Sequence, residues 1–112
     1  MNWPNDADGD VLTRLESDDF NYNIEHTIDF NIDFEIWPLS IEAIKAFESL
    51  YPGCEFIDPD EEDIINGETN GYIQFTITAK LTYDLVIEIQ QEATKKAEKY
   101  GGWCESWGVV NN

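Results

Sequence analysis

The sequence has few basic residues and no long apolar run. Lysine and arginine together number 6 against 24 acidic residues, so the formal net charge is −18 at pH 7. A field of this sign repels nucleic acid and anionic membranes, and it attracts basic partners over roughly a Debye length. No stretch reaches the roughly 18 consecutive apolar residues of a membrane span, and no apolar leader follows Met1. We therefore expect a cytoplasmic protein with no direct binding to nucleic acid or membranes.

Histidine and cysteine are also scarce, which excludes the common metal and nucleophile patterns. Cys54 and Cys104 have no histidines at zinc-binding spacing, and thiols stay reduced in the cytosol. The single histidine, His26, occupies an inward position of a predicted strand, which favours a hydrogen-bonded core or sheet-end residue over a general base. No nucleophile elbow or phosphate-binding glycine loop is present. The sequence thus predicts no catalytic residue, no metal and no cofactor.

One acidic segment resembles the start of a calcium-binding loop. Asp6, Asp8 and Asp10 match the first three side-chain ligand positions of such a loop. However, Val11 stands where the loop needs glycine, and Ser17 stands where it needs glutamate. Acidic capping at the start of a helix explains the same residues, because the helix dipole favours negative charge there.

Two segments alternate between apolar and polar side chains with a period of two. In residues 24–37 every even position up to Ile36 is apolar or histidine, and the odd positions up to Glu35 are polar, mostly acidic. Residues 72–82 alternate in the same way. This pattern is typical of strands with one buried and one solvated face. Helical spacing predicts helices over 8–17, 41–50 and 85–100, with Ser40 and Asp84 as the expected N-caps of the second and third. Shorter apolar runs predict strands over 54–58 and 103–110.

The predicted order is a leading helix followed by β-α-β-β-α-β. It favours an α+β, ferredoxin-like two-layer sandwich, with a four-stranded, mainly antiparallel sheet and two helices on one face. The first and third strands are central in this topology, in agreement with their length. We expect one domain over residues 1–112, with a flexible N-terminus at 1–7 and an acidic open face that the leading helix shields in part.

Two features suggest where a basic partner could dock. The first is an acidic run that we expect to form a loop: Asp58, Asp60, Glu61, Glu62 and Asp63. Carboxylates in such a run accept bidentate bonds from arginine, although an acidic loop can also be merely solvated.

The second feature is a pair of tryptophans near the C-terminus. Trp103 and Trp107 are four residues apart, so in a regular strand they share one face, with Glu105 between them. Exposed tryptophan beside carboxylates receives arginine by stacking, whereas the alternative is core packing. The predicted partner-binding residues are the acidic run together with Trp103, Glu105 and Trp107.

Four segments in order resemble the ribonuclease E inhibitor family, also called regulator of ribonuclease activity B. They are DGDVL at 8–12, YNIEH at 22–26, FIDPDEE at 56–62 and GGWCESWG at 101–108. The similarity covers about residues 8–110. In the last segment Cys104, Glu105 and Ser106 stand where the family usually has tyrosine, aspartate and glycine, and the long acidic tail of some relatives is absent.

The resemblance implies a bacterial, cytosolic and non-catalytic regulator with a ferredoxin-like fold. Characterised members of the family bind the arginine-rich scaffold region of ribonuclease E and reduce RNA cleavage. We therefore expect an acidic inhibitor that acts as a monomer or weak dimer and is not an enzyme. An immunity-type protein that neutralises a dedicated basic toxin is the alternative, and an enzyme using His26 is a third hypothesis.

Overall fold

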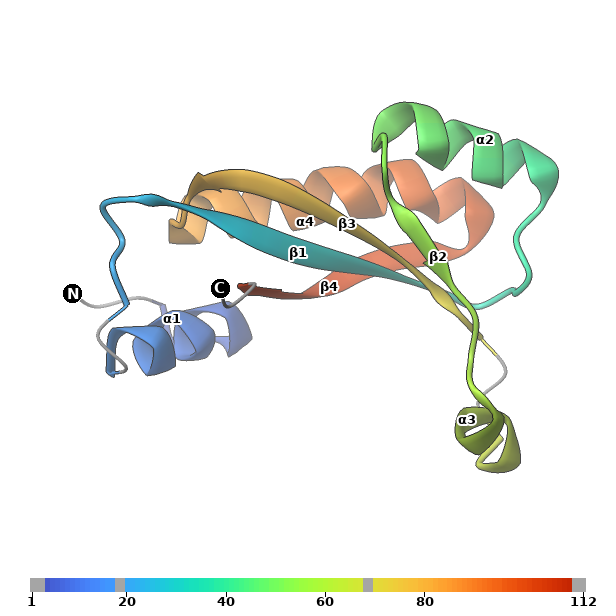
Figure 1. Cartoon of the computed structure of the whole chain (residues 1–112), viewed down its shortest axis with the longest axis horizontal. Coiled ribbons are helices and arrows are strands. Elements are labelled where there is room, and N and C mark those ends of the chain that lie inside the picture. Colours follow the sequence, from blue (N-terminus) through green and yellow to red (C-terminus); the bar gives the residue numbers. More distant parts are fainter. Residues whose placement is uncertain (1–3, 18–19, 68–69, 110–112) are drawn as a thin grey trace.

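The computed structural model describes residues 4–17, 20–67 and 70–109 (Figure 1). Its elements follow the predicted order, with one addition. They are α1 (Ala7–Ser17), β1 (Glu25–Phe34), α2 (Ile41–Leu50), β2 (Glu55–Ile57), α3 (Glu61–Ile65), β3 (Tyr72–Lys80), α4 (Tyr83–Ala97), a 3₁₀ turn (Glu98–Tyr100) and β4 (Gly102–Val109). Of the predicted flexible segment 1–7, residues 1–3 lie outside the described part. Within the described part, no helix is long and apolar enough to cross a bilayer.

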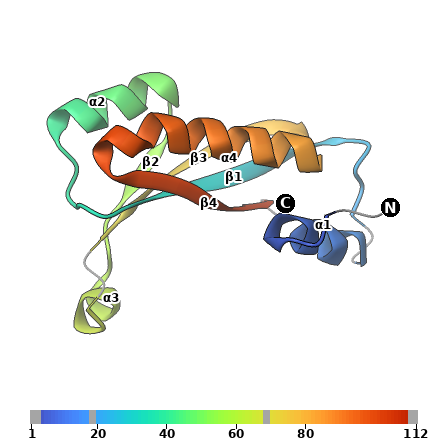
Figure 2. The same ribbon diagram turned by 180° about the vertical axis from the view of Figure 1, so that it is seen from behind.

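The strands form one antiparallel sheet in the order β2-β3-β1-β4. β1 and β3 lie side by side in the middle of the sheet, paired from Glu25 opposite Lys80 to Asp33 opposite Tyr72. Helices α2 and α4 cover one face (Figures 1 and 2). The predicted ferredoxin-like α+β sandwich with two central long strands is therefore confirmed.

The alternation of β1 sets the core. Its inward side chains are at most 1% exposed and pack beneath the helices: Ile28, Phe30, Ile32 and Phe34. The strand is shorter than the alternation predicted, since Ile24 and Ile36 are 52% and 68% exposed. The ladder to β3 begins only at Glu25, and the Glu35 N–H bonds to the carbonyl of Gly101 instead of continuing a strand pair.

Helix ends follow ordinary capping chemistry, with one correction. Ser40 caps α2, its hydroxyl accepting from the Ala43 N–H at 3.2 Å as predicted. The predicted cap of α4 at Asp84 is wrong, because Thr82 accepts from the Leu85 N–H at 3.1 Å and the helix begins at Tyr83.

The leading helix α1 lies at the β4 edge of the sheet, beside α4 (Figures 1 and 2). Its Leu12 is fully buried and belongs to the main core. The expectation that this helix shields the polar sheet face is wrong, since its contacts are with α4 and with the helix-facing side of β4.

The acidic run is not a simple loop, because it contains α3. Residues 58–67, which we call the arm, project from the sheet between β2 and β3 (Figures 1 and 2). Asp60 caps α3 by accepting from the Asp63 N–H at 2.8 Å, and the Asp63 carboxylate accepts from the Asp60 N–H at 3.3 Å. No residue of α3 is buried, and Ile64 and Ile65 are 53% and 83% exposed.

Candidate functional site

The sheet face opposite α2 and α4 is polar and acidic, as the alternation predicts. It carries the outward side chains of the central strands: Glu25, Thr27, Asp29, Asn31 and Asp33 from β1, and Gln74, Thr76 and Thr78 from β3. Glu55 of β2 pairs with Gln74 and adds another carboxylate to this face. Lys80 lies opposite Glu25 at one end. No element of the described part of the chain covers this face (Figures 1 and 2).

A hydrogen-bonded ladder fixes the middle of the open face. The Gln74 amide donates to Asp29 Oδ2 and to Asn31 Oδ1, both at 3.2 Å. The Asn31 amide in turn donates to Ser106 Oγ at 3.2 Å, so three strands are linked by side chains. The polar groups here bond mainly to one another, which makes the centre of this face a rigid support for groups at its ends.

A β-bulge in β4 separates the two tryptophans. Asn31 pairs with Ser106, but Ile32 pairs with Cys104, so Glu105 has no partner on β1. An extra residue in one strand reverses the alternation beyond it. Trp103 therefore lies opposite Asp33 on the open face, whereas Trp107 lies opposite Phe30 on the helix-facing side. The prediction that these tryptophans share one face is wrong, because a spacing of four preserves the face only in a strand without a bulge.

Trp107 joins three elements on the helix-facing side. Its indole N–H donates to Asp8 Oδ1 at 2.7 Å, and the Gln90 amide donates to the same oxygen at 3.1 Å. Trp107 also packs against the main core. This arrangement matches the packing alternative given for Trp107 and holds α1 against α4 and β4.

Trp103 lies in a hollow of about 420 Å³ at one end of the open face. β1 runs antiparallel to β3 and β4, so its carboxyl end meets the amino ends of both neighbours. The hollow is lined by Asp33, Phe34, Gly67, Asn70, Gly71, Trp103 and Glu105. Gly67 is the last described residue of the arm, so the arm and the tryptophan site meet here.

The hollow combines an indole ring with two carboxylates, and none of the described residues that line it is basic. Partial burial, and then the negative charge of Glu105, raise the pKa of Asp33 above its ordinary value. A cation that entered the hollow would relieve this repulsion. Carboxylates beside a tryptophan are the groups that recognise a guanidinium, by bidentate bonds and by stacking.

The acidic run divides into anchoring and exposed members. Asp58 accepts from the Trp37 indole N–H at 2.8 Å, while Asp60 and Asp63 bond to each other's backbone in the capping box. Glu61 and Glu62 are exposed on the first turn of α3. Of the five predicted residues, these two take no part in the bonds that anchor the other three.

His26 has the structural role that the sequence analysis favoured. His26 Nε2 lies 2.7 Å from the Asn21 carbonyl, and its ring stacks on Phe20 with 4.2 Å between centroids. His26 is half-buried near the start of β1, with Ala79 as its partner in β3. The interpretation as a hydrogen-bonded sheet-end residue is confirmed.

Two of the three aspartates of the calcium-like segment bond within the protein. Asp6 caps α1 by accepting from the Gly9 N–H at 2.8 Å, and it accepts from the Tyr83 hydroxyl at 2.6 Å. Asp8 binds Gln90 and Trp107 as described above. Among the described residues, no group of three or more histidines, cysteines and acids is placed to hold a metal ion.

Sequence reasoning missed Asp33 as a member of the site. Its position on the outer face was predicted, but its proximity to Trp103 and Glu105 depends on the bulge and on the base of the arm. The one signal in the sequence was the position of Asp33 near the end of an alternating strand, because neighbouring antiparallel strands begin at that end.

A comparison with protein families gives one match over nearly the whole chain. A family model described as "Regulator of ribonuclease activity B" matches residues 5–109. No curated protein matches the chain. The family match agrees with the resemblance carried by the four sequence segments.

Proposed function

Since the chain belongs to the family named regulator of ribonuclease activity B, we propose that it regulates ribonuclease E by binding an arginine-rich segment of that enzyme. In this proposal the chain performs no reaction of its own. It modulates RNA degradation from the cytoplasm by occupying a basic region of its partner.

The observation that carries the proposal is the hollow at the end of the open face. Asp33 and Glu105 line it together with Trp103, and no basic side chain is present among its described lining residues. An arginine side chain that enters would stack on the indole and bond to the carboxylates. Partial burial, and then the charge of Glu105, disfavour ionised Asp33. A guanidinium bound beside these two carboxylates would therefore be attracted by both and would offset their repulsion.

The remaining charge directs the encounter. A net charge of −18 attracts a basic segment, and Glu61 and Glu62 on the arm extend that field beside the hollow. Trp107, which faces the helices, is not part of the proposed surface. Asp58, Asp60 and Asp63 contribute charge, but their bonds mainly shape the arm.

The proposal is tested by calorimetric titration with the arginine-rich segment of ribonuclease E. The double variant Asp33→Asn/Glu105→Gln removes two carboxylates from the hollow, and Glu42→Gln/Glu88→Gln removes two exposed carboxylates from the helices. Both variants change the net charge equally. We expect the first to weaken binding by roughly tenfold or more, since charge-assisted bonds are lost, and the second by less than about threefold, since only long-range charge is lost.

Two outcomes would contradict the proposal. Equal affinities for the two double variants would show that the hollow does not bind the segment. The absence of any binding at low ionic strength would remove ribonuclease E as the partner. Trp103→Ala gives a second check, because it removes the stacking surface and leaves the net charge unchanged.

A further inference from the structure

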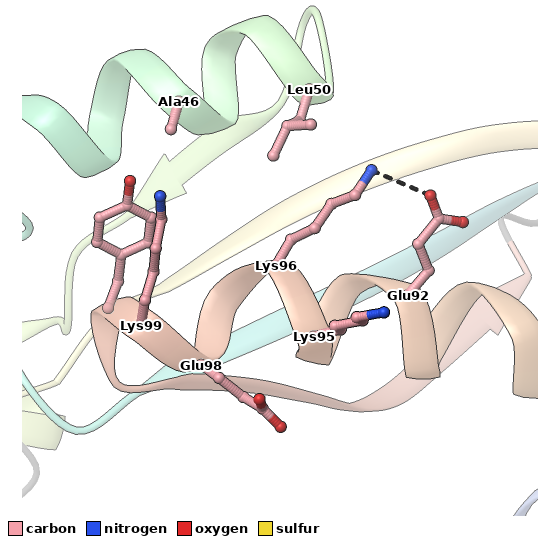
Figure 3. A pocket seen from close by; sticks show the side chains of 8 residues that line it. Ala46, Leu50, Glu92, Lys95, Lys96, Glu98 and Lys99 are labelled. Atoms are coloured by element: carbon pink, nitrogen blue, oxygen red, sulfur yellow. Dashed lines mark hydrogen bonds and ion pairs between the residues drawn. The ribbon is translucent and has the colours of Figure 1, made fainter.

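Half of the basic residues of this acidic protein line one groove. The groove lies between the C-terminal halves of α2 and α4 and has a volume of about 650 Å³ (Figure 3). Three of the six basic residues of the chain line it, together with apolar and aromatic side chains and two glutamates. The lining residues are Ala46, Leu50, Glu92, Lys95, Lys96, Glu98, Lys99 and Tyr100.

The side chains of the groove form an apolar strip with ammonium groups along it. Lys96 of α4 and Lys99 of the following 3₁₀ turn extend toward α2, where Leu50 and Ala46 face them. Glu98 points away from α2 (Figure 3). Lys96 bonds to Glu92 at 3.0 Å. Leu50 is 40% exposed, so the apolar part of this strip is open to a ligand.

The arm has the complementary chemistry. It places exposed Glu61 and Glu62 one turn before exposed Ile64 and Ile65, and none of the residues of α3 is buried. An isolated helix of five residues is marginal in water, and the bonds that hold α3 are the capping box and backbone bonds of its own turns. An element of this kind becomes stable when its apolar side chains are covered.

We propose that the arm of one molecule docks into the groove of a second copy of this chain. Ile64 and Ile65 would cover Leu50 and Ala46, and Glu61 and Glu62 would pair with Lys96 and Lys99. The groove lies on the α2 side of the molecule and the arm extends from the opposite side, so the arm does not reach its own groove (Figures 1 and 2). This proposal does not rest on the proposed binding to ribonuclease E, although Glu61 and Glu62 contribute to both.

The high net charge makes this association depend on ionic strength. Two molecules of charge −18 repel each other over tens of ångströms at low salt. At physiological ionic strength the Debye length is about 8 Å, so the local pairing of arm and groove outweighs the distant repulsion. Self-association is therefore expected to strengthen from low to physiological salt, whereas attraction to a basic partner weakens over the same range.

Sedimentation equilibrium of the whole chain at physiological salt tests the proposal. We expect weak, concentration-dependent association that Ile64→Asn/Ile65→Asn reduces by roughly tenfold or more. Glu61→Lys/Glu62→Lys and Lys96→Glu/Lys99→Glu should each do the same, because each places like charges in contact. In a mixture of these two charge variants, the lysine arm of the first can pair with the glutamate groove of the second. The original arm of the second can likewise pair with the original groove of the first, so association should return.

The control is Glu42→Lys/Glu88→Lys, which changes the net charge as much as the arm variant does but lies outside arm and groove. Circular dichroism verifies that every variant is folded. A monomer at all concentrations up to millimolar would overturn the proposal, and so would association that persists in the arm variants. If the arm variant and the groove variant are each monomeric alone and their mixture also fails to associate, arm and groove do not contact each other.

Discussion

At the scale of single residues, the acidic side chains serve different purposes that their spacing does not reveal. Asp8 bonds to Gln90 and to Trp107, which are 82 and 99 residues away in the chain. The sequence correctly predicted acidic capping of the first helix, because a cap involves neighbouring residues. It could not predict these partners, because their proximity is a consequence of the complete fold.

Replacing Asp8 with alanine should destabilise the protein. The change leaves the indole N–H of Trp107 and the amide of Gln90 without their shared acceptor in a part-buried position. We expect the free energy of unfolding, measured by urea titration, to fall by about 1–3 kcal/mol. Asp10→Ala, an exposed position in the same helical turn, is the control and should cost less than about 1 kcal/mol. Equal losses would mean that only the helix dipole matters at these sites.

Asp33 should show opposite effects on stability and on binding. Burial and Glu105 raise its pKa in the folded state, so the folded state prefers the protonated carboxyl. The contribution of Asp33 to the free energy of unfolding is therefore most favourable below pH 3.8, the ordinary pKa of an aspartate. This contribution declines as the pH rises through the higher pKa of the folded state.

We accordingly expect Asp33→Asn to raise the free energy of unfolding at pH 7 by less than about 1 kcal/mol, because solvent screens a partly exposed group. The gain over the original chain should vanish below pH 3.8, and binding to the arginine-rich segment should weaken. Unfolding curves from pH 3 to 7 measure the stability. Destabilisation at pH 7 would show that the carboxylate makes a favourable contact instead.

At the scale of elements, periodic segments were predictable and irregular ones were not. The alternation in β1 and β3 placed them together at the centre of the sheet, because only one register buries the isoleucines and phenylalanines. The bulge at Glu105 and the helix in the arm have no such periodic signal. The capping box of Asp60 and Asp63 could have indicated α3, but its five residues are too few for a helical repeat.

Deleting Glu105 should leave the fold intact. Ser106 and Cys104 already pair with Asn31 and Ile32, so removing the residue between them turns the bulge into a regular ladder. Trp103 and Trp107 then stay on their present faces. Deleting Thr76 from the unbulged β3 is the control, because it moves one half of a central strand to the wrong face.

Thermal unfolding followed by circular dichroism measures both deletion variants. We expect a cooperative transition for the chain without Glu105 and none for the chain without Thr76. Loss of the transition in the first variant would show that the bulge is required for the sheet to form.

At the scale of the whole molecule, half of the basic residues lie together on the helix side of the sheet, opposite the acidic open face. The open face and the arm carry carboxylates, whereas Lys95, Lys96 and Lys99 line the groove between α2 and α4. The sequence predicted the total charge and a basic partner class. It could not predict that Trp103, Asp33 and Glu105 share a hollow, because that requires the sheet order and the bulge together.

We propose above that a basic segment of ribonuclease E docks on the open face at Trp103. The most direct measurement follows the indole N–H signals of the tryptophans by nuclear magnetic resonance while the arginine-rich segment is added. We predict that the signal of Trp103 shifts with saturation, while that of Trp107, bonded to Asp8 on the helix-facing side, stays in place. A shift of Trp107 with Trp103 unchanged would place the partner on the other side of the sheet and contradict this account.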